Sequence, residues 1–245
     1  CITDQWLMNL DNLNRVIHFE ENEKGLYADV TVEAGLRVYQ LSEILSERGY
    51  AIQNLGSISE QSVAGIISTG THGSSPYHGL VSSQYVNLTI VNGKGEVVFL
   101  DSEHEPEVFR AACLSLGKIG IIVKATIRAI PAFNIKSTQE VINFETLLNN
   151  WETIWTSSEF IRCWWYPYTR KVILWRGSKT EEPLTAPRKS WWGSTLGRFL
   201  YESLIWLSVK IYPGLTPYVE SFVFHQQYGR VETYGSGDIA VQSSI

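Results

Sequence analysis

The stretch from Asn54 to Ser75 constrains this sequence most, because it combines four glycines with many hydroxyl side chains around a short apolar centre. The glycines are Gly56, Gly65, Gly70 and Gly73. Glycine lets the main chain approach a ligand or take a positive φ, and successive N–H groups and helix N-termini attract anions. The composition predicts a backbone cradle for a phosphate-bearing cofactor. A Gly/Ser-rich surface turn is the alternative interpretation.

Within this stretch, residues 62–68 predict a short helix with Ser59 or Ser62 as its N-cap. The N-terminus of that helix is expected to supply donors to the anion, and residues 69–74 predict a tight loop after it. The common nucleotide loops are missing from the sequence. No Gly-x-Gly-x-x-Gly follows a strand, and Gly93-Lys94 is not followed by Ser or Thr. A Rossmann NAD site and a P-loop are therefore disfavoured.

Two motifs carry a family resemblance. Residues 62–73, with Ser-Val-Ala-Gly leading into Thr-Gly-Thr-His-Gly, resemble the second flavin-binding segment of the sugar-lactone oxidases. These enzymes are a branch of the vanillyl-alcohol-oxidase-type (PCMH-type) FAD flavoproteins. Residues 116–122, Leu-Gly-Lys-Ile-Gly-Ile-Ile, and a strand ending at Pro131 are similar to the end of the FAD domain in the same family. The resemblance implies that FAD is the cofactor and that the backbone near Ile122 faces its adenine end.

The cradle and the resemblance together give a set of expected FAD contacts. They are Gly56, Ser57, Ser59, Ser62, Gly65, Thr69, Gly70, Thr71, His72, Gly73 and Ile122. Ser62 matches a family position where a hydroxyl faces flavin and substrate, and a role as helix cap is its alternative. His72 is expected to contact the flavin without a covalent bond; holding its own loop by local hydrogen bonds is its alternative. No other catalytic residue is expected within the chain.

The pattern of strands and helices predicts an α+β fold. Strands are expected at residues 2–8, 14–20, 26–32, 85–91, 96–100 and 116–131, and helices at 36–48 and 105–116. The resemblance makes residues 1–132 a PCMH-type FAD-binding domain, incomplete at its N-terminus. Residues 133–245 are expected to form an α+β substrate domain, incomplete at its C-terminus.

The expected second domain is rich in tryptophan. Its tryptophans are Trp151, Trp155, Trp164, Trp165, Trp175, Trp191, Trp192 and Trp206. Such rings line sugar pockets or act as core and interface anchors. Residues 160–166 and 171–176 predict a hairpin. Residues 198–212 form an apolar segment that is too short for a bilayer, which needs about 20 apolar residues. This segment either lies on a membrane surface or is buried against the second domain.

Composition excludes several classes of protein. Hydrophobic residues make up 44% of the chain and charged residues 18%, as in folded globular proteins. The net charge is −5 and the basic residues are scattered, which argues against nucleic acid as a partner. Neither the cysteines nor the histidines are spaced as metal ligands, so no metal is expected. The cysteines are Cys1, Cys113 and Cys163, and the histidines are His18, His72, His78, His104 and His225.

The chain begins at Cys1 without Met and stops in a polar run at Ile245, so we expect a piece of a longer protein. The resemblance implies that a Gly-x-Gly-His-Ser loop, whose histidine binds FAD covalently, precedes Cys1. It also implies that a substrate-facing Glu-x-Arg pair and a His-Trp-x-Lys segment follow Ile245. The isolated chain is therefore expected to bind FAD weakly, never covalently, and to be inactive.

The resemblance implies FAD-dependent oxidation of an aldonolactone, with O2 as acceptor and a dehydro-lactone and H2O2 as products. The expected partners are a small-molecule sugar lactone and O2. The family also implies a mitochondrial outer-membrane location, with peripheral membrane association. A dehydrogenase of the same fold that uses another electron acceptor is the first alternative. A non-enzymatic flavin-binding module is the second.

Overall fold

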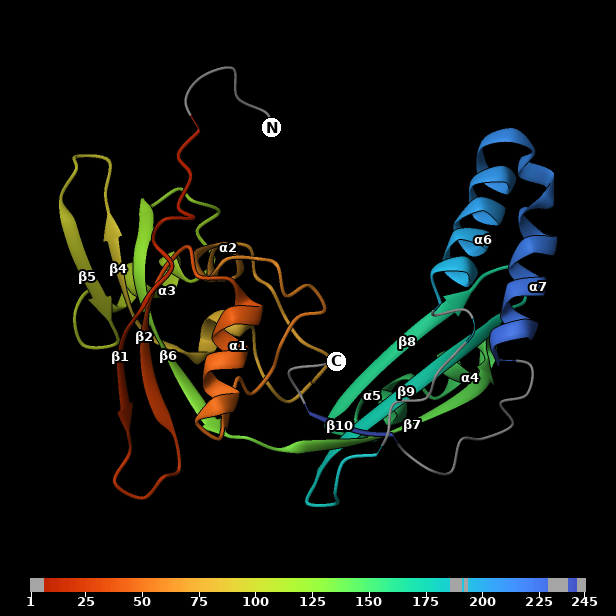
Figure 1. Ribbon diagram of the computed structural model, residues 1–245, viewed down its shortest axis with the longest axis horizontal. Helices are drawn as coiled ribbons and strands as arrows, with labels where there is room; N and C mark the ends of the chain where they lie inside the picture. The colour runs from red at the N-terminus through yellow and green to blue at the C-terminus, as the bar shows by residue number, and fades with distance from the viewer. Residues whose placement is uncertain (1–6, 186–190, 192–193, 229–237, 242–245) are drawn as a thin grey trace. The chain divides into compact units, whose positions relative to one another are not determined.

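The computed structural model describes residues 7–185, 191, 194–228 and 238–241. The chain divides into two compact units between Phe133 and Asn134 (Figure 1). The first unit contains a six-stranded sheet and the second a four-stranded one. Helices accompany both sheets, so the expected α+β class is confirmed.

The first unit is built on an antiparallel sheet with the order β1-β2-β6-β4-β5, and β3 pairs with β6. Its strands are β1 (Val16–Glu21), β2 (Ala28–Glu33), β3 (Tyr50–Ala51), β4 (Tyr85–Val91), β5 (Val97–Asp101) and β6 (Ile121–Pro131). Its helices are α1 (Val38–Glu47), α2 (Val63–Ser68), η1 (Val81–Gln84) and α3 (Pro106–Ala112). The β-branched strand β6 is central because it pairs with β2, β3 and β4, and it ends at Pro131, whose nitrogen cannot donate.

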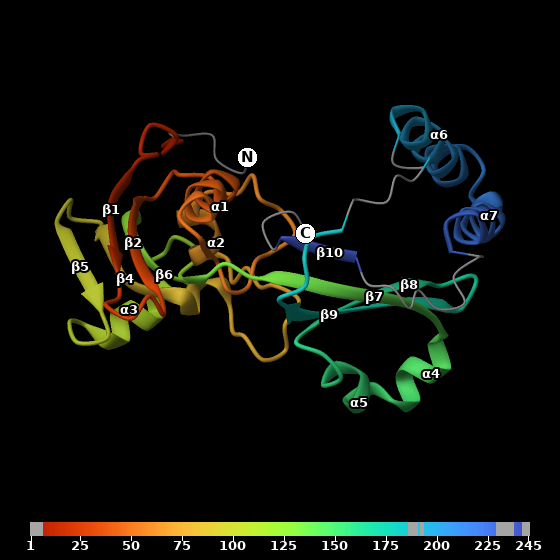
Figure 2. The same ribbon diagram turned by 60° about the horizontal axis from the view of Figure 1, so that its bottom comes forward.

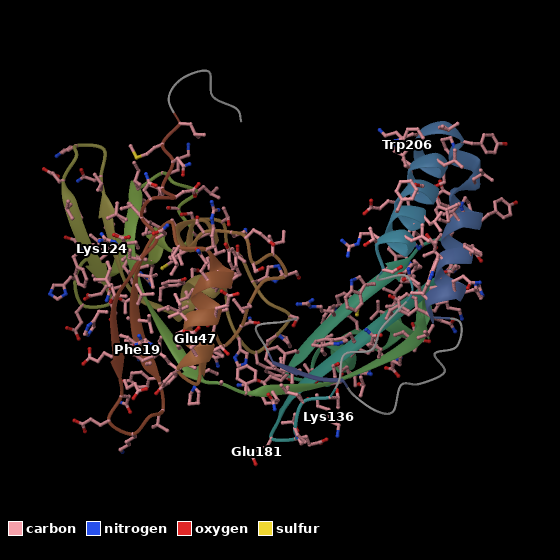
Figure 3. All side chains as sticks on the ribbon, in the orientation of Figure 1. Phe19, Glu47, Lys124, Lys136, Glu181 and Trp206 are labelled. Atoms are coloured by element: carbon pink, nitrogen blue, oxygen red, sulfur yellow. The ribbon has the colours of Figure 1, made fainter. Side chains whose placement is uncertain are left out.

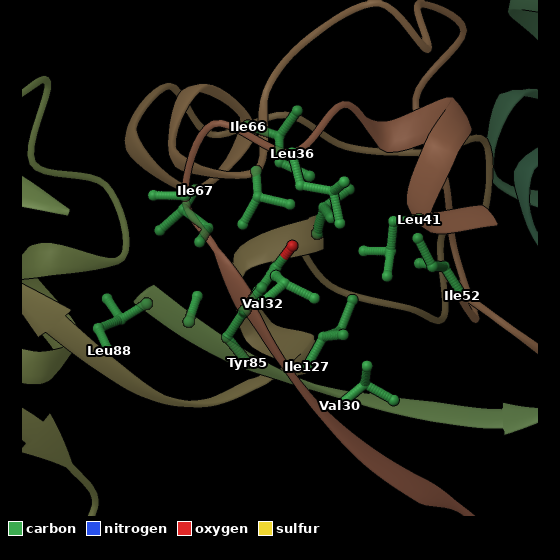
Figure 4. Close-up of a cluster of buried hydrophobic side chains, with 14 of the residues drawn as sticks. Val30, Val32, Leu36, Leu41, Ile52, Ile66, Ile67, Tyr85, Leu88 and Ile127 are labelled. Atoms are coloured by element: carbon green, nitrogen blue, oxygen red, sulfur yellow. The ribbon is translucent and has the colours of Figure 1, made fainter. Parts of the chain in front are cut away.

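The core of this unit lies between one face of the sheet and helices α1 and α2 (Figure 4). Strand β2 alternates, so that Val30 and Val32 are fully buried. Leu41 and Leu45, four residues apart on α1, are also fully buried. Burying one such aliphatic side chain contributes about 1.5–3 kcal/mol. The core thus fixes α1 and α2, and with them the glycine-rich stretch.

Three expected elements of the first unit differ from the structure, and one of them, the strand expected at 116–131, begins only at Ile121. Leu7 and Met8 belong to an irregular segment and not to a strand, while the remainder of the expected strand 2–8 lies outside the described residues. That segment joins the unit by isolated bonds, such as Gly35 N to Leu13 O at 2.8 Å, instead of a ladder. The expected helix 105–116 ends at Ala112, because Leu116 takes a positive φ of 50° and its N–H donates to Ser68 O at 3.0 Å.

The second unit has a sheet with the order β10-β7-β9-β8. Its strands are β7 (Asn134–Asn143), β8 (Phe160–Tyr166), β9 (Lys171–Thr180) and β10 (Asp238–Val241). Its helices are α4 (Phe144–Asn149), α5 (Trp151–Trp155), α6 (Thr195–Trp206), η3 (Leu207–Ile211), η4 (Pro213–Leu215) and α7 (Thr216–Tyr228). The expected hairpin is β8 and β9, and β9 extends to Thr180 because it pairs with β7 along its whole length.

Helices α4 and α5 cover one face of this second sheet, and α6 and α7 lie on its other side (Figure 2). Leu147 and Ile154 of the two short helices are buried against the sheet residues Ile161, Val172 and Leu174. The apolar segment expected at 198–212 is helical through α6 and η3. No helix among the described residues has the length and apolar character needed to cross a bilayer.

Tyr85 carries an unpaired polar atom into the core of the first unit. Its ring lies among the buried residues beneath α2 (Figure 4), and its hydroxyl has no hydrogen-bond partner in the described part of the chain. Burial raises the pKa of Tyr85 well above its usual value. The hydroxyl therefore gives up its bonds to water on folding without a replacement.

We expect Tyr85→Phe to raise the free energy of unfolding by about 1 kcal/mol, because the desolvation cost of the hydroxyl is removed. Thermal or urea unfolding measures the change. Tyr50→Phe is the matched control, since Tyr50 is also buried but its hydroxyl is hydrogen-bonded to Glu21; it should lower stability. A loss of stability in Tyr85→Phe would show that the hydroxyl has a partner in the folded protein.

Candidate functional site

Two loops on either side of α2 lie against each other and form the cradle. A Cβ added at Gly56 would stand 2.9 Å from Cγ2 of Thr71. A Cβ added at Gly73 would stand 1.8 Å from Oδ1 of Asn54 and 2.8 Å from the Leu55 carbonyl oxygen. Real Cβ atoms do not approach other atoms this closely. The main chains of the two loops can therefore meet only because these positions are glycine.

Asn54 holds the base of the cradle together. Its side chain is 1% exposed, and its amide nitrogen donates to the carbonyl oxygens of His78 at 3.4 Å and Gly79 at 3.3 Å. Gln84 completes the connection: its amide nitrogen donates to Asn54 O at 3.0 Å and its amide oxygen accepts from Gln53 N at 3.0 Å. Two side-chain amides thus join the start of the first loop to the end of the second.

Ser62 is the N-cap of α2, as one of the two sequence interpretations predicted. Its backbone is extended and its hydroxyl oxygen accepts from Gly65 N at 3.2 Å. The hydroxyl proton of Ser62 is not used in this bond. The same side chain can therefore cap the helix and donate a hydrogen bond to a ligand, so the two roles considered for Ser62 are compatible.

The expectation that the N-terminus of α2 supplies free donors to an anion is wrong. Val63 N donates to Leu36 O and Ala64 N donates to Ala34 O, each at 2.9 Å. The segment before α1 runs alongside the start of α2 and takes up these first-turn donors. With Gly65 N bound to the Ser62 hydroxyl, the helix end is saturated by the protein itself.

The loop after α2 is ordered by its own polar groups. The Thr69 hydroxyl donates to Gly65 O at 2.9 Å, so in its 3.4 Å contact with the Thr71 hydroxyl the hydrogen comes from Thr71. Nδ1 of His72 lies 2.9 Å from Gly73 O, and a carbonyl oxygen only accepts, so Nδ1 carries the proton. His72 therefore holds its own loop, as the alternative proposed, and its exposed ring leaves Nε2 for an outside partner.

The donors that remain for an anion lie in the loops. The N–H groups of Ser57, Ile58 and Ser74 donate to no acceptor within the described residues. The only acidic residue between 54 and 75 is Glu60, which is exposed. Gly70 takes a positive φ of 67° where the second loop begins. The cradle therefore presents main-chain donors with little competing negative charge, which fits a phosphate-bearing group.

Ile122 lies in β6, apart from the two loops in the sequence. Its side chain is buried in the core and it pairs with Ile90 of β4. Just before it, Gly120 has a φ of 156°, and a Cβ there would stand 2.5 Å from Val91 O. This close approach explains the second glycine of the Leu-Gly-Lys-Ile-Gly motif. A contact between the Ile122 backbone and a cofactor stays a prediction.

The second unit contains a basic residue that the sequence analysis missed. Arg162 of β8 is half-buried and its guanidinium carbon lies 5.8 Å from the centre of the Trp175 ring. Burial lowers the pKa of Arg162, and no carboxylate of the described residues pairs with it. Arg176 on the neighbouring strand pairs with Glu140. Strand periodicity alone does not show which arginines lack a partner, so Arg162 could not be identified from its neighbours in the sequence.

The tryptophans of the second unit serve several roles. Trp175 is buried, Trp165 stacks on Phe144, and Trp151 meets Trp155 edge to face. Five tryptophans are exposed, and Trp192 lies outside the described residues; the five are Trp151, Trp164, Trp165, Trp191 and Trp206. The anchor interpretation thus describes only some of them.

No group of three metal-ligating side chains occurs in the part of the chain that the structure describes, where Cys113 and Cys163 are free thiols.

Gly73→Ala is expected to push the two loops apart, because its Cβ would overlap the Asn54 side chain and the Leu55 carbonyl. We expect a loss of about 1–3 kcal/mol in unfolding free energy and loss of flavin retention in the full-length protein. Thermal unfolding and visible flavin absorbance measure these changes. Gly93→Ala is the control, since a Cβ there meets open space. Equal stability and flavin content in the two variants would contradict the loop packing.

Each half of the chain matches a known protein family. Residues 1–101 match the family described as "FAD binding domain", and residues 125–245 match "D-arabinono-1,4-lactone oxidase". Among solved structures, cholesterol oxidase from Brevibacterium sterolicum has a TM-score of 0.74 at 19% identity, covering 94% of this chain and 47% of that one. A carbohydrate oxidase from Microdochium nivale has a TM-score of 0.56 at 23% identity, covering 68% of this chain and 37% of that one. These two structures show a shared fold.

Curated relatives are much more similar in sequence. The D-arabinono-1,4-lactone oxidase of Kluyveromyces lactis is 90% identical and that of Saccharomyces cerevisiae 69% identical, each over 100% of this chain. The chain spans 47% of the length of each of these relatives. The whole chain therefore belongs to the D-arabinono-1,4-lactone oxidase family.

Proposed function

We propose that the full-length protein oxidises D-arabinono-1,4-lactone and related aldonolactones with FAD, and passes the electrons to O2. The products are the dehydro-lactone, which leads to erythroascorbate, and H2O2. The observation that carries the proposal is 90% identity along the entire chain to a protein named for this activity. The chain itself supplies the loop frame of the cofactor site, and the family match over residues 1–101 supports FAD as the group it holds.

When bound, FAD would supply the acceptor for the hydride of the lactone and the route of the electrons to oxygen. The residues of this chain are proposed to bind and orient the cofactor. The main-chain N–H groups of Ser57, Ile58 and Ser74 are the donors proposed for phosphate oxygens. Thr71 and His72 offer a hydroxyl and a ring nitrogen on the same loop. Of the other predicted contacts, the glycines act through the main-chain path that they allow, and Ser59, Thr69 and Ile122 stay predictions; the glycines are Gly56, Gly65, Gly70 and Gly73.

Ser62 is proposed to face the flavin and the substrate. The Ser62 oxygen accepts from Gly65 N. Its O–H group therefore points away from the helix end and can donate to a lone pair on the ligand. The hydroxyl is also held in place by the cap, which removes the rotamer freedom that a surface serine keeps. A donor fixed in this way loses little entropy when it binds.

Two further parts of the proposal concern the rest of the protein. The covalent link to FAD is assigned to a histidine upstream of Cys1, since none of the five histidines here stands at the linkage position. The mitochondrial outer membrane is the proposed location, on the family resemblance.

The purified full-length protein should carry a yellow chromophore and release H2O2 when D-arabinono-1,4-lactone is added in air. Peroxide release and lactone consumption should rise together in a one-to-one ratio, because the two electrons removed from one lactone reduce one O2 to H2O2. Turnover that requires an artificial acceptor and yields no peroxide would instead establish the dehydrogenase. A bound flavin that no lactone reduces under anaerobic conditions would contradict both enzymatic assignments.

Ser62→Ala should lower the unfolding free energy by about 1 kcal/mol through the lost cap. It should also reduce kcat/KM about ten- to a hundredfold through the lost donor, without loss of FAD. Ser62→Asp separates the two effects, because its carboxylate oxygen restores the cap but has no proton to donate. We expect Ser62→Asp to recover stability but not turnover. If Ser62→Ala loses stability and keeps its kcat/KM, the residue is a cap only.

A further inference from the structure

Arg162 of β8 lies on the face of the second sheet opposite to α4 and α5. Its neighbours Ile161 and Cys163 belong to the cluster beneath those two helices, and successive side chains of a strand point to opposite faces. Arg162 stands opposite Trp175 of β9, and Gln139 of β7 stands opposite Trp175 from the other side. The side chains of Arg162, Trp175 and Gln139 therefore form one row across the sheet.

The Trp175 ring is a base on which the guanidinium of Arg162 rests. A Cβ added at Gly177 would stand 2.6 Å from Cη2 of Trp175 and 2.9 Å from Cγ2 of Ile135. Because position 177 has no side chain, the ring can lie over it, and Trp175 is only 7% exposed. The guanidinium carbon lies 5.8 Å from the centre of this ring. A cation is attracted to an aromatic face, so the ring restricts where the guanidinium can lie.

The other basic side chains of β7, β8, β9 and their connections have partners. Lys136, which Figure 3 labels, lies 2.6 Å from a carboxylate oxygen of Glu182. The remaining pairs are Lys171 with Asn143 at 2.7 Å, Lys179 with Glu159 at 3.1 Å, Arg170 with Glu145, and Arg176 with Glu140. Between residues 134 and 180, Arg162 is thus the one basic side chain without a carboxylate or amide partner among the described residues.

A guanidinium that is half-buried without a counter-charge is unfavourable. Burial lowers the pKa of Arg162, as expected for a charge that has lost part of its water and gained no carboxylate. Arginine nevertheless stays protonated at neutral pH, because its ordinary pKa is far higher. Its planar fork of N–H donors therefore remains for acceptors that the described part of the chain does not supply.

The chemistry of the family indicates which acceptor fits this fork. The FAD-binding match covers residues 1–101, whereas the D-arabinono-1,4-lactone oxidase match covers residues 125–245 and so includes Arg162. An aldonolactone is uncharged, and its carbonyl carbon is bonded to a carbon that carries a hydroxyl. A guanidinium can donate two parallel N–H bonds to neighbouring oxygens of this kind. An aromatic base with a few polar groups beside it is also typical of small-molecule sites.

We propose that Arg162 binds the lactone by donating to its carbonyl oxygen and to the neighbouring hydroxyl, while Trp175 holds the guanidinium in place. This inference rests on the proposed function and adds a substrate-binding residue in the second unit. A neutral lactone needs no second charge in the site, because the guanidinium makes each bond charge-assisted. A carboxylate from another part of the full-length protein is the other partner that the fork would accept.

Arg162→Gln in the full-length protein tests the inference. Mixing with D-arabinono-1,4-lactone without O2 gives both the maximal rate of flavin reduction and the lactone concentration at half that rate. We expect this concentration to rise about ten- to a hundredfold, because bonds to a charged donor are lost. Flavin absorbance should be unchanged. The midpoint of thermal unfolding should stay the same or rise, because an unpaired, half-buried charge is removed.

Arg176→Gln is the matched control on the neighbouring strand. Arg176 is bonded to Glu140 and to the Ser157 hydroxyl, so its loss leaves a carboxylate without its partner. We expect the control to lower the midpoint of thermal unfolding and to leave the lactone concentration for half-maximal reduction unchanged. The two arginines should therefore show opposite patterns, one in substrate binding and the other in stability.

Several outcomes overturn the inference. An unchanged lactone dependence in Arg162→Gln, in a protein that oxidises lactone, overturns it and leaves the proposed function standing. Flavin that no lactone reduces in the unaltered protein contradicts the proposed function, and the inference with it. A loss of stability as large as that of Arg176→Gln would show that a carboxylate elsewhere pairs with Arg162. If Arg162→Gln does not fold, Arg162→Lys decides, since it keeps the charge but not the fork; an unchanged lactone dependence there contradicts the paired bonds.

Discussion

The amide of Asn54 is the contact on which the arrangement of the cradle depends. It is buried, it binds two carbonyls at the end of the second loop, and its oxygen fills the space beside Gly73. A buried amide without partners is unfavourable, so these bonds and the loop closure stabilise each other. Ile52, two residues before Asn54, is buried in the core of the first unit, so the start of the first loop is anchored there.

The sequence predicted much of the first unit because its signals are local. Strand β2 alternates, and Gly25 and Gly49 end a turn and a helix at positive φ, so each can be identified from neighbouring residues. The saturation of α2 could not be predicted in this way. Its first donors are taken by the carbonyls of Ala34 and Leu36, and nothing near residue 63 indicates that this segment passes there.

The second unit was harder to predict. Strand β7 was missed because its half-buried, largely polar run does not alternate cleanly. Helices α4 and α5 were missed because each is short and presents a single buried residue to the sheet. Arg162 could not be identified because its burial without a carboxylate partner depends on which residues pack around it in the fold. The family resemblance nevertheless predicted the fold and the cofactor. Related chains share the same long-range contacts, so a short motif indicates a fold that local patterns do not reveal.

The saturated start of α2 also has a consequence for redesign of the site. The bonds that fix the helix run from main chain to main chain, through Val63 and Ala64, and Gln61 O likewise accepts from Val38 N. Main-chain bonds are indifferent to side-chain identity. Position 61, which is only partly buried, can therefore be diversified in a library, whereas Ala64 packs against the core. Such a library would vary the chemistry and shape beside the cofactor loops while the scaffold that carries Ser62 stays in register.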